Sequence, residues 1–266
     1  MPEKKLISIG TFVDELQSNG RYTFTRAEFE ATGGRTAISV QAALRRLKNR
    51  GRVVSPRRGF YVVVPVEYRS AGCPPASWFI DDLMNFFDQP YYASLLTSAA
   101  IHGAAHQQPM TFQVLTDRST RPVQVARVRI EFHISRRIDR SYAIDVQTET
   151  GSMRVATPEQ TAYDLVRYPG SAGHLSNVAT VLAELAEKLN PAALLKIAPL
   201  FKLSDVQRLG YLLDLVSQEK LADPLAIWLS KRRSRRLLLR VGMEAKNKKA
   251  DNRWRVVPNE AVEVDL

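Results

Sequence analysis

The sequence lacks the features that lead a chain out of the cytoplasm. Cys73 is its one cysteine among 266 residues, so no internal disulfide can form and a reducing compartment is expected. No stretch approaches the ~18 consecutive apolar residues of a membrane span. The opening MPEKKLISIG has lysines but no sustained apolar run behind them, unlike a secretory signal. The sequence therefore predicts a soluble, cytoplasmic protein with no membrane partner.

Motifs of nucleotide-binding and hydrolytic enzymes are also missing. There is no GxxxxGK[ST] or GxGxxG loop and no GxSxG elbow. Gly151-Ser152 lacks the paired aspartates with which a nucleotidyltransferase holds magnesium. Asp145 and Glu149 are weak carboxylate candidates for a nuclease, because no lysine accompanies them. We therefore expect no enzymatic activity and no cofactor.

A metal site is not expected either. His102 and His106 are four residues apart, which could place both on one helical face. Gly103 is expected to end the helix between them, and no cysteine cluster lies nearby. A hydrogen-bonded helix end is the simpler role for this pair.

Acidic residues are absent between Glu30 and Glu67. Residues 1–69 hold 13 Lys and Arg against 6 Asp and Glu, while residues 70–230 hold 14 against 16. Such a basic block repels itself unless it is solvated or meets a polyanion, and phosphate contacts with counterion release are its natural use. The basic residues of this acid-free stretch are Arg35, Arg45, Arg46, Lys48, Arg50, Arg52, Arg57 and Arg58.

The same stretch has the pattern of a winged helix-turn-helix. Thr25 can cap one helix, and Ser39 can cap a second over residues 40–49, which Gly51 ends. Two strands are expected at residues 52–54 and 60–64, around a turn at residues 55–59. Helix, turn, helix and an arginine-tipped hairpin predict a DNA-binding domain over residues 1–69.

Periodicity divides the second helix into two faces. Its apolar residues Val40, Ala43, Leu44 and Leu47 recur every three or four positions and are predicted to face inward. The polar face suits base edges and phosphates, because Arg can bind guanine and Gln can bind adenine in bidentate fashion. The predicted double-stranded DNA contacts are Arg35, Thr36, Ser39, Gln41, Arg45, Arg46, Lys48, Arg57 and Arg58.

The rest of the chain predicts an α+β domain over residues 70–266, joined by a Pro-rich linker at about residues 65–76. Strands are expected at residues 110–116, 123–136 and 153–156, and helices at residues 77–87 and 91–102. Thr157-Pro158 should begin another helix, and four leucine-rich helices are expected in residues 174–230, opened in part by Pro191 and Ser204. A small sheet packed with a helical bundle is the predicted architecture.

Further basic residues lie outside the N-terminal stretch. Residues 231–266 hold 11 Lys and Arg against 5 Asp and Glu. Two arginines of the expected strand at residues 123–136 and four in this C-terminal stretch are candidates for a second nucleic-acid surface, and a solvated surface is the alternative. These candidates are Arg127, Arg129, Arg232, Arg233, Arg235 and Arg236.

Three stretches resemble the AbiEi antitoxin family of type IV toxin–antitoxin systems. They are ALRRLKNRGRVVSPRRGFYVVVP, YYASLLTSAAIHGAAHQQPMTFQVLTDR and VATPEQTAYDLVRYPGSAGHLSNVATVLAEL. The resemblance implies a winged-helix domain that binds inverted repeats in its own promoter and represses the operon. It also implies a C-terminal antitoxin domain that counteracts a nucleotidyltransferase toxin without forming a stable complex, in phage defence by abortive infection. A stand-alone transcriptional regulator with a partner- or effector-binding C-terminal domain is the alternative hypothesis.

Overall fold

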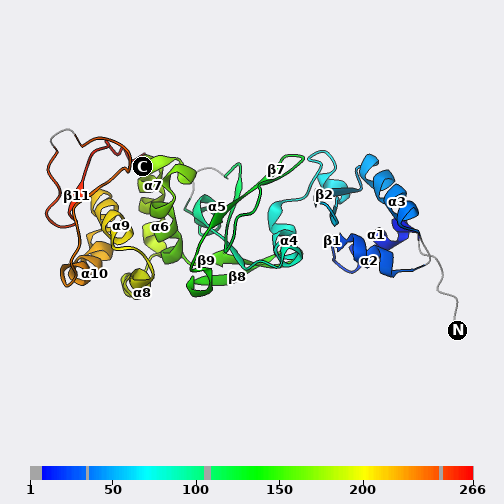
Figure 1. Ribbon diagram of the computed structural model, residues 1–266, viewed down its shortest axis with the longest axis horizontal. Coiled ribbons are helices and arrows are strands. Elements are labelled where there is room, and N and C mark those ends of the chain that lie inside the picture. Colours follow the sequence, from blue (N-terminus) through cyan, green and yellow to red (C-terminus); the bar gives the residue numbers. More distant parts are fainter. Residues whose placement is uncertain (1–7, 34–35, 105–108, 246–247, 266) are drawn as a thin grey trace. The chain divides into compact units, whose positions relative to one another are not determined.

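The computed structural model describes residues 8–33, 36–104, 109–245 and 248–265, and it mixes helices with strands as expected (Figure 1). The chain forms two compact units that alternate along the sequence. Unit 1 comprises Met1–Tyr91, Met110–Ser135 and Asp145–Arg154, and unit 2 comprises Tyr92–Pro109, Arg136–Ile144 and Val155–Leu266. All of residues 1–69 lie in unit 1, which continues beyond them, so the domain boundary after Arg69 stays a prediction.

The described residues in the N-terminal part of unit 1 form three helices and three strands around one apolar core. Val40, Leu44 and Leu47 of α3 are buried in this core, as their spacing predicts, together with Phe24 and Phe29. The strands form an antiparallel sheet in the order β1-β3-β2. The elements are α1 (Ile9–Ser18), β1 (Thr23–Thr25), α2 (Arg26–Ala31), α3 (Ala37–Asn49), β2 (Val53–Arg57) and β3 (Phe60–Val63).

One predicted helix cap is confirmed and the other is wrong. Thr25 forms a capping box, in which its Oγ1 accepts from the Glu28 N–H at 3.1 Å and its own N–H donates to Glu28 Oε2 at 2.6 Å. Ser39 does not cap α3. Thr36 does, because its extended backbone precedes the first helical turn and its Oγ1 accepts from the Ser39 N–H at 3.2 Å.

The hairpin turn is shorter than expected. β2 runs on to Arg57 with a register irregularity between Val54 and Arg57, and Arg57 pairs with Phe60. The expected turn at residues 55–59 is therefore wrong in its first three residues. Arg58 and Gly59 make the turn, and Gly59 takes a φ of 91°, which glycine adopts without strain.

After the β2–β3 hairpin, the described residues of unit 1 form 3₁₀ turns, one helix and three strands that lie wholly within this unit. The expected linker has buried Cys73 and Pro74 between two 3₁₀ turns, and the helix expected from Ser77 begins at Ile80. β5 pairs with β7 in parallel, and β6 pairs with β7 antiparallel. The elements are η1 (Val66–Tyr68), η2 (Ala76–Trp78), α4 (Ile80–Phe87), β5 (Phe112–Thr116), β6 (Val123–Val125) and β7 (Val128–Ile134).

Three strands pass from one unit to the other. They are β4 (Tyr91–Ala93), β8 (Ala143–Thr148) and β9 (Gly151–Ala156). β4 and β9 are parallel partners, with Ala93 opposite Val155. The helix expected over residues 91–102 is thus a strand followed by a shorter helix, because a buried apolar run also suits a short strand.

Unit 2 is largely helical. Thr157 caps α6 as expected and accepts from the Gln160 N–H at 3.3 Å. Pro191 begins α8 as expected, and Asn190 caps that helix. α9 begins at Leu203 rather than Ser204. The elements are α5 (Leu95–Ile101), η3 (Ile138–Arg140), α6 (Pro158–Arg167), η4 (Pro169–Ala172), α7 (His174–Leu185), η5 (Ala186–Lys188), α8 (Pro191–Ile197), η6 (Ala198–Leu200), α9 (Leu203–Leu215), α10 (Glu219–Ser230), β10 (Leu237–Leu238) and β11 (Val256–Val257).

Candidate nucleic-acid interface

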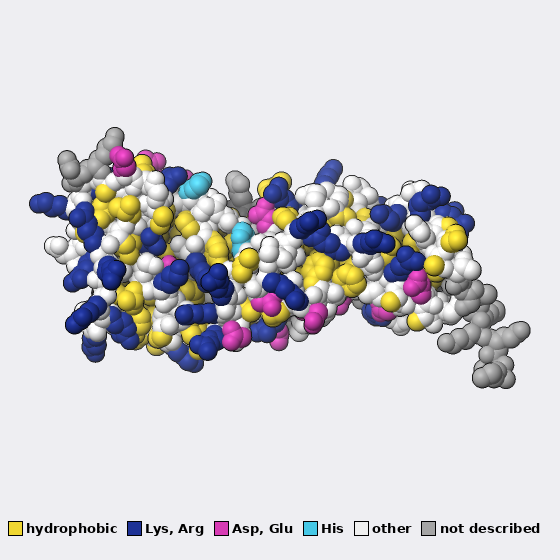
Figure 2. Space-filling view, viewed as in Figure 1, with side chains coloured by type: hydrophobic (Ala, Val, Ile, Leu, Met, Phe, Trp, Pro, Cys, Tyr) yellow, Lys and Arg dark blue, Asp and Glu magenta, His cyan; other side chains and the backbone are white. Residues whose placement is uncertain are grey.

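A groove of about 440 Å³ lies in unit 1 between α3 and the β2–β3 hairpin. It brings together three of the predicted α3 contacts and one of the predicted hairpin arginines. Figure 2 shows Lys and Arg side chains gathered over the α3 region of this unit. The lining residues are Arg26, Gln41, Leu44, Arg45, Lys48, Asn49, Arg58 and Tyr61.

The amphipathic sequence of α3 orients the groove. Gln41, Arg45 and Lys48 follow one another at spacings of four and three residues, so they share one helical face and are exposed. Leu44 is buried in the core and also borders the groove. Burial of the apolar face therefore directs the polar face outward as a row.

Backbone bonds hold the hairpin beside the helices. The Arg26 N–H donates to the Gly59 carbonyl at 2.8 Å, which ties the turn to the start of α2. The Tyr61 ring stacks on Phe24, with ring centroids 5.2 Å apart and planes 15° apart. Arg58 in the turn is consequently presented at the same groove as α3.

Acidic residues form ion pairs with two arginines of unit 1 that are not part of the row on α3. Arg26 pairs with Glu30 at 2.7 Å, and Arg52 pairs with Asp14. By contrast, no described residue forms an ion pair with Arg45, Lys48 or Arg58. The groove thus has uncompensated positive charge, which favours an anionic ligand.

Tyr61 adds a hydroxyl group to the groove. Burial raises the pKa of its phenol, Arg26 lowers it and Glu30 raises it. The phenol therefore stays protonated at neutral pH and can donate a hydrogen bond. The sequence pattern did not predict Tyr61 or Arg26 as groove residues, because strand β3 and helix α2 meet α3 only in the folded domain.

The other predicted DNA contacts have different surroundings. Arg35 lies outside the described residues. Thr36 is the α3 cap, and Ser39 and Arg46 are exposed on α3 but do not line the groove. The Arg57 guanidinium donates to the carbonyls of Arg121 and Pro122 and lies over the Phe87 ring, so the two hairpin arginines have separate environments.

The predicted second basic residues lie in both units. In unit 1, Arg127 is exposed and Arg129 pairs with Glu131 at 2.7 Å. In unit 2, the Arg232 guanidinium lies 3.6 Å from the Trp228 ring centroid, and Arg236 donates to a backbone carbonyl. The remaining two, Arg233 and Arg235, are exposed.

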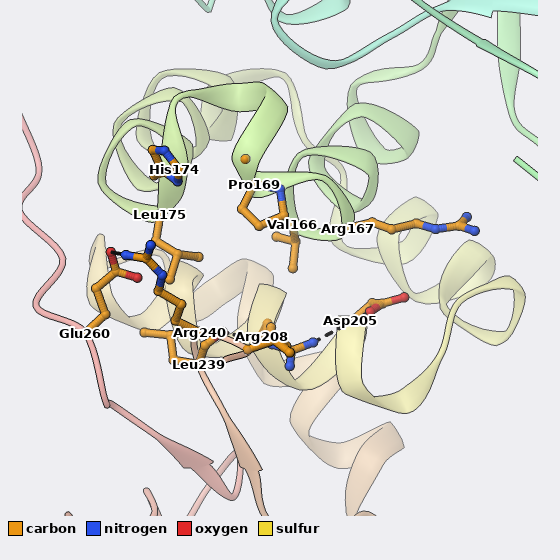
Figure 3. A pocket seen from close by; sticks show the side chains of 12 residues that line it. Val166, Arg167, Pro169, His174, Leu175, Asp205, Arg208, Leu239, Arg240 and Glu260 are labelled. Atoms are coloured by element: carbon orange, nitrogen blue, oxygen red, sulfur yellow. Dashed lines mark hydrogen bonds and ion pairs between the residues drawn. The ribbon is translucent and has the colours of Figure 1, made fainter. Parts of the chain in front are cut away.

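Unit 2 has a cavity of about 390 Å³ of its own (Figure 3). Arg208 and Arg240 border it, but both guanidinium groups are engaged. Arg208 donates to the Leu239 carbonyl at 3.0 Å, and Arg240 pairs with Glu260 at 2.8 Å. Residues from 166 to 260 contribute to the lining, so no local sequence pattern could predict this cavity.

The histidines and carboxylates that could have served metal or enzymatic chemistry do not form such a site among the described residues. His102 Nε2 lies 2.7 Å from the Ala156 carbonyl oxygen, and His106 lies outside the described residues. Asp145 is in β8 and Glu149 follows that strand. In the described part of the chain, no group of three or more His, Cys, Asp or Glu residues could hold a metal ion.

None of the helices that the structure describes is long and apolar enough to cross a membrane.

Residues 92–215 match the family model described as the AbiEi antitoxin C-terminal domain. This region is similar to the AbiEi antitoxin C-terminal domain. The match covers almost all of the second and third stretches that resemble the family and confirms the resemblance there, whereas the first stretch, at residues 43–65, lies outside it. It supports a role in a toxin–antitoxin system. No curated protein sequence matches the chain.

Two solved structures were similar enough to this chain to be aligned with it. The crystal structure of the RV2827C protein from Mycobacterium tuberculosis aligns with a TM-score of 0.65 at 15% identity, over 92% of this chain and 89% of that chain. A nucleotidyltransferase-like antigenic protein from Paracoccidioides brasiliensis aligns with a TM-score of 0.36 at 8% identity, over 56% of this chain and 90% of that chain. The first likeness shows a shared fold, and the second is too weak to do so.

Proposed function

We propose that this chain is a DNA-binding antitoxin that represses its own operon. Residues 1–69 form a winged helix-turn-helix domain, with α3 as the recognition helix and the β2–β3 hairpin as the wing. The observation that supports this best is the groove in which Arg45, Lys48 and Arg58 meet, three cations with which no described residue forms an ion pair. Inverted repeats in the promoter are the proposed target, and the cytoplasm is the proposed location.

The groove residues have distinct roles on the duplex. Gln41 and Arg45 read base edges in the major groove, since their side chains can make two hydrogen bonds with adenine and guanine respectively. Lys48 and Arg58 contact phosphates. Thr36, the cap of α3, and Arg35, which precedes it in the sequence, position the helix on DNA phosphates.

The AbiEi domain supplies the second half of the proposal. Its family description supports an antitoxin role, and we propose that the target is a nucleotidyltransferase toxin encoded alongside. The absence of a stable complex is part of the proposal. Co-expression with that toxin tests the antitoxin role, because growth should be rescued by this chain and also by an Arg45→Ala variant in which repression is weakened.

The Arg45→Ala variant also tests DNA reading. In the full-length chain, it should weaken binding to the upstream region by ~1–3 kcal/mol and relax sequence preference at one base pair. Fluorescence anisotropy on matched and single-substituted duplexes measures both effects. Arg69→Ala, an exposed arginine of unit 1 outside the groove, is the control for loss of charge. Full affinity and unchanged preference in Arg45→Ala would contradict the assignment.

A stand-alone regulator is the second candidate function. The cavity of unit 2 favours it, because its polar groups could bind a small effector (Figure 3). The neighbouring reading frame separates the two candidates. A nucleotidyltransferase gene beside this one favours the antitoxin, and its absence favours the regulator.

A further inference from the structure

A second basic hollow lies in unit 1 at the wing. It has a volume of about 390 Å³ and is shallow. Its polar side chains come from the wing, from the segment that follows α4 and from the loop between β5 and β6. The residues that line it are Arg57, Phe87, Gln89, Ser119, Thr120 and Arg121.

The loop in this hollow is held at three places. Thr120 Oγ1 donates to Gln89 Oε1 at 2.7 Å, and Arg118 donates to the Phe87 carbonyl at 3.3 Å. Arg57 of the wing donates to the Arg121 and Pro122 carbonyls. The loop and the wing therefore form one connected surface, which needs little ordering before it binds a ligand.

The charges of the hollow favour an anion. Two guanidinium groups, those of Arg57 and Arg121, line it, and no carboxylate does. Burial and the charge of Arg121 lower the pKa of Arg57, so the two like charges repel each other. No described residue forms an ion pair with Arg121. A bound oxyanion would relieve this repulsion.

We infer that this hollow is a phosphate subsite, occupied by a backbone phosphate of the DNA on which the wing lies. Arg57 and Arg121 bind the phosphate by charge, and Ser119 donates a neutral hydrogen bond from its exposed hydroxyl. Arg, Ser and Thr side chains are common phosphate donors in protein–DNA complexes. The inference rests on the proposed function and extends the DNA surface to residues 119–121, beyond the predicted N-terminal domain.

The salt dependence of DNA binding tests the inference. In the full-length chain, Arg121→Ala should weaken binding about five- to tenfold near 0.1 M salt for all sequences alike. It should also reduce the slope of log K against log salt by up to ~0.9, the value for one phosphate contact, since Arg57 still neutralises part of that phosphate. Arg69→Ala is the matched control and should change neither quantity. Ser119→Ala should weaken binding with an unchanged slope, because its hydroxyl is neutral.

A double-mutant cycle examines the pair of arginines. If Arg57 and Arg121 hold the same phosphate, the double alanine variant should lose less affinity than the product of the two single losses. Equality with that product would overturn a shared phosphate.

The outcomes separate this inference from the function on which it rests. If Arg121→Ala behaves like Arg69→Ala while Arg45→Ala still weakens binding, the subsite is overturned and the proposed function stands. If the wild-type chain does not bind its upstream DNA, the proposed function fails and the subsite assignment fails with it. The hollow could instead bind free phosphate. Titration with inorganic phosphate, followed by the amide NMR signals of Ser119 and Thr120, tests this alternative. Submillimolar saturation without any effect of Arg121→Ala on DNA would make this a site for free phosphate and overturn the inference.

Discussion

Asp164 lies in the region that matches the AbiEi family model. Its carboxyl group has no access to solvent. It accepts hydrogen bonds from Ser94 Oγ at 2.9 Å, from the Tyr92 hydroxyl at 3.1 Å and from Gln160 Nε2 at 3.2 Å. Burial raises its pKa to about 6, although these bonds and the charge of Arg167 lower it. The residue therefore links the stability of unit 2 to pH.

The direction of that pH dependence follows from the two protonation states. The pKa of Asp164 is about 6 in the folded chain and near 3.8 in the unfolded chain, so the folded chain binds more protons between these values. The contribution of Asp164 to the free energy of unfolding should thus fall as pH rises from about 4 to 6, by at most about 1.4 kcal/mol per pH unit.

Urea unfolding at several pH values, compared with Asp164→Asn, measures this contribution. The difference in unfolding free energy between the two proteins should change across this range. Asp139→Asn, at an exposed carboxyl, is the control. Parallel curves for wild type and Asp164→Asn would contradict the raised pKa.

At the scale of single elements, the beginning of α3 determines where its exposed side chains lie. Thr36 and Ser39 are both good capping residues three positions apart, and either could have begun the helix. In the structure Ser39 is inside the first turn, where its Oγ donates to the Thr36 carbonyl at 3.0 Å. The first turn of α3 thus depends on Thr36.

Substitution of each residue distinguishes the two caps. Thr36→Ala should destabilise the first turn of α3 by about 1 kcal/mol, because the Ser39 N–H loses its acceptor. Ser39→Ala should cost a few tenths of that, and Thr36→Ser should restore the cap. Hydrogen exchange of the Ser39 and Val40 amides in the full-length chain reports the change. Equal effects of Thr36→Ala and Ser39→Ala would disprove the assignment.

At the scale of the whole molecule, the last part of the chain completes unit 2. Trp254 is buried, and its indole Nε1 donates to Asp214 at 2.6 Å. Gln207 Nε2 donates to the Trp254 carbonyl at 2.7 Å. α9 therefore holds the C-terminal segment through the buried Trp254 ring and through these two hydrogen bonds.

Gly210 on α9 makes room for the Trp254 ring. A Cβ at this position would lie 2.1 Å from a ring carbon, so the ring must shift. Gly210→Ala should destabilise unit 2 by ~1–3 kcal/mol through overpacking. Gly170→Ala, where no atom lies within 4 Å of the added carbon, is the control. Thermal unfolding followed by tryptophan fluorescence measures both, and equal midpoints would refute the packing argument.

Local sequence patterns predicted several features that the structure confirms. The Thr25 and Thr157 caps and the buried apolar face of α3 all follow from spacings of three or four residues. These features depend on backbone groups one helical turn apart, so neighbouring residues determine them. The acid-free basic block and the resemblance to the AbiEi family were likewise visible in the sequence alone.

Only the tertiary structure decided which distant groups meet. Arg57 and Arg58 are adjacent in the sequence, yet one reaches the Arg121 carbonyl and the other lines the α3 groove. The same holds for Trp254 and Gly210, and for the two units that alternate along the chain. These arrangements arise from the packing of segments that are tens of residues apart, and a local pattern contains no information about such partners.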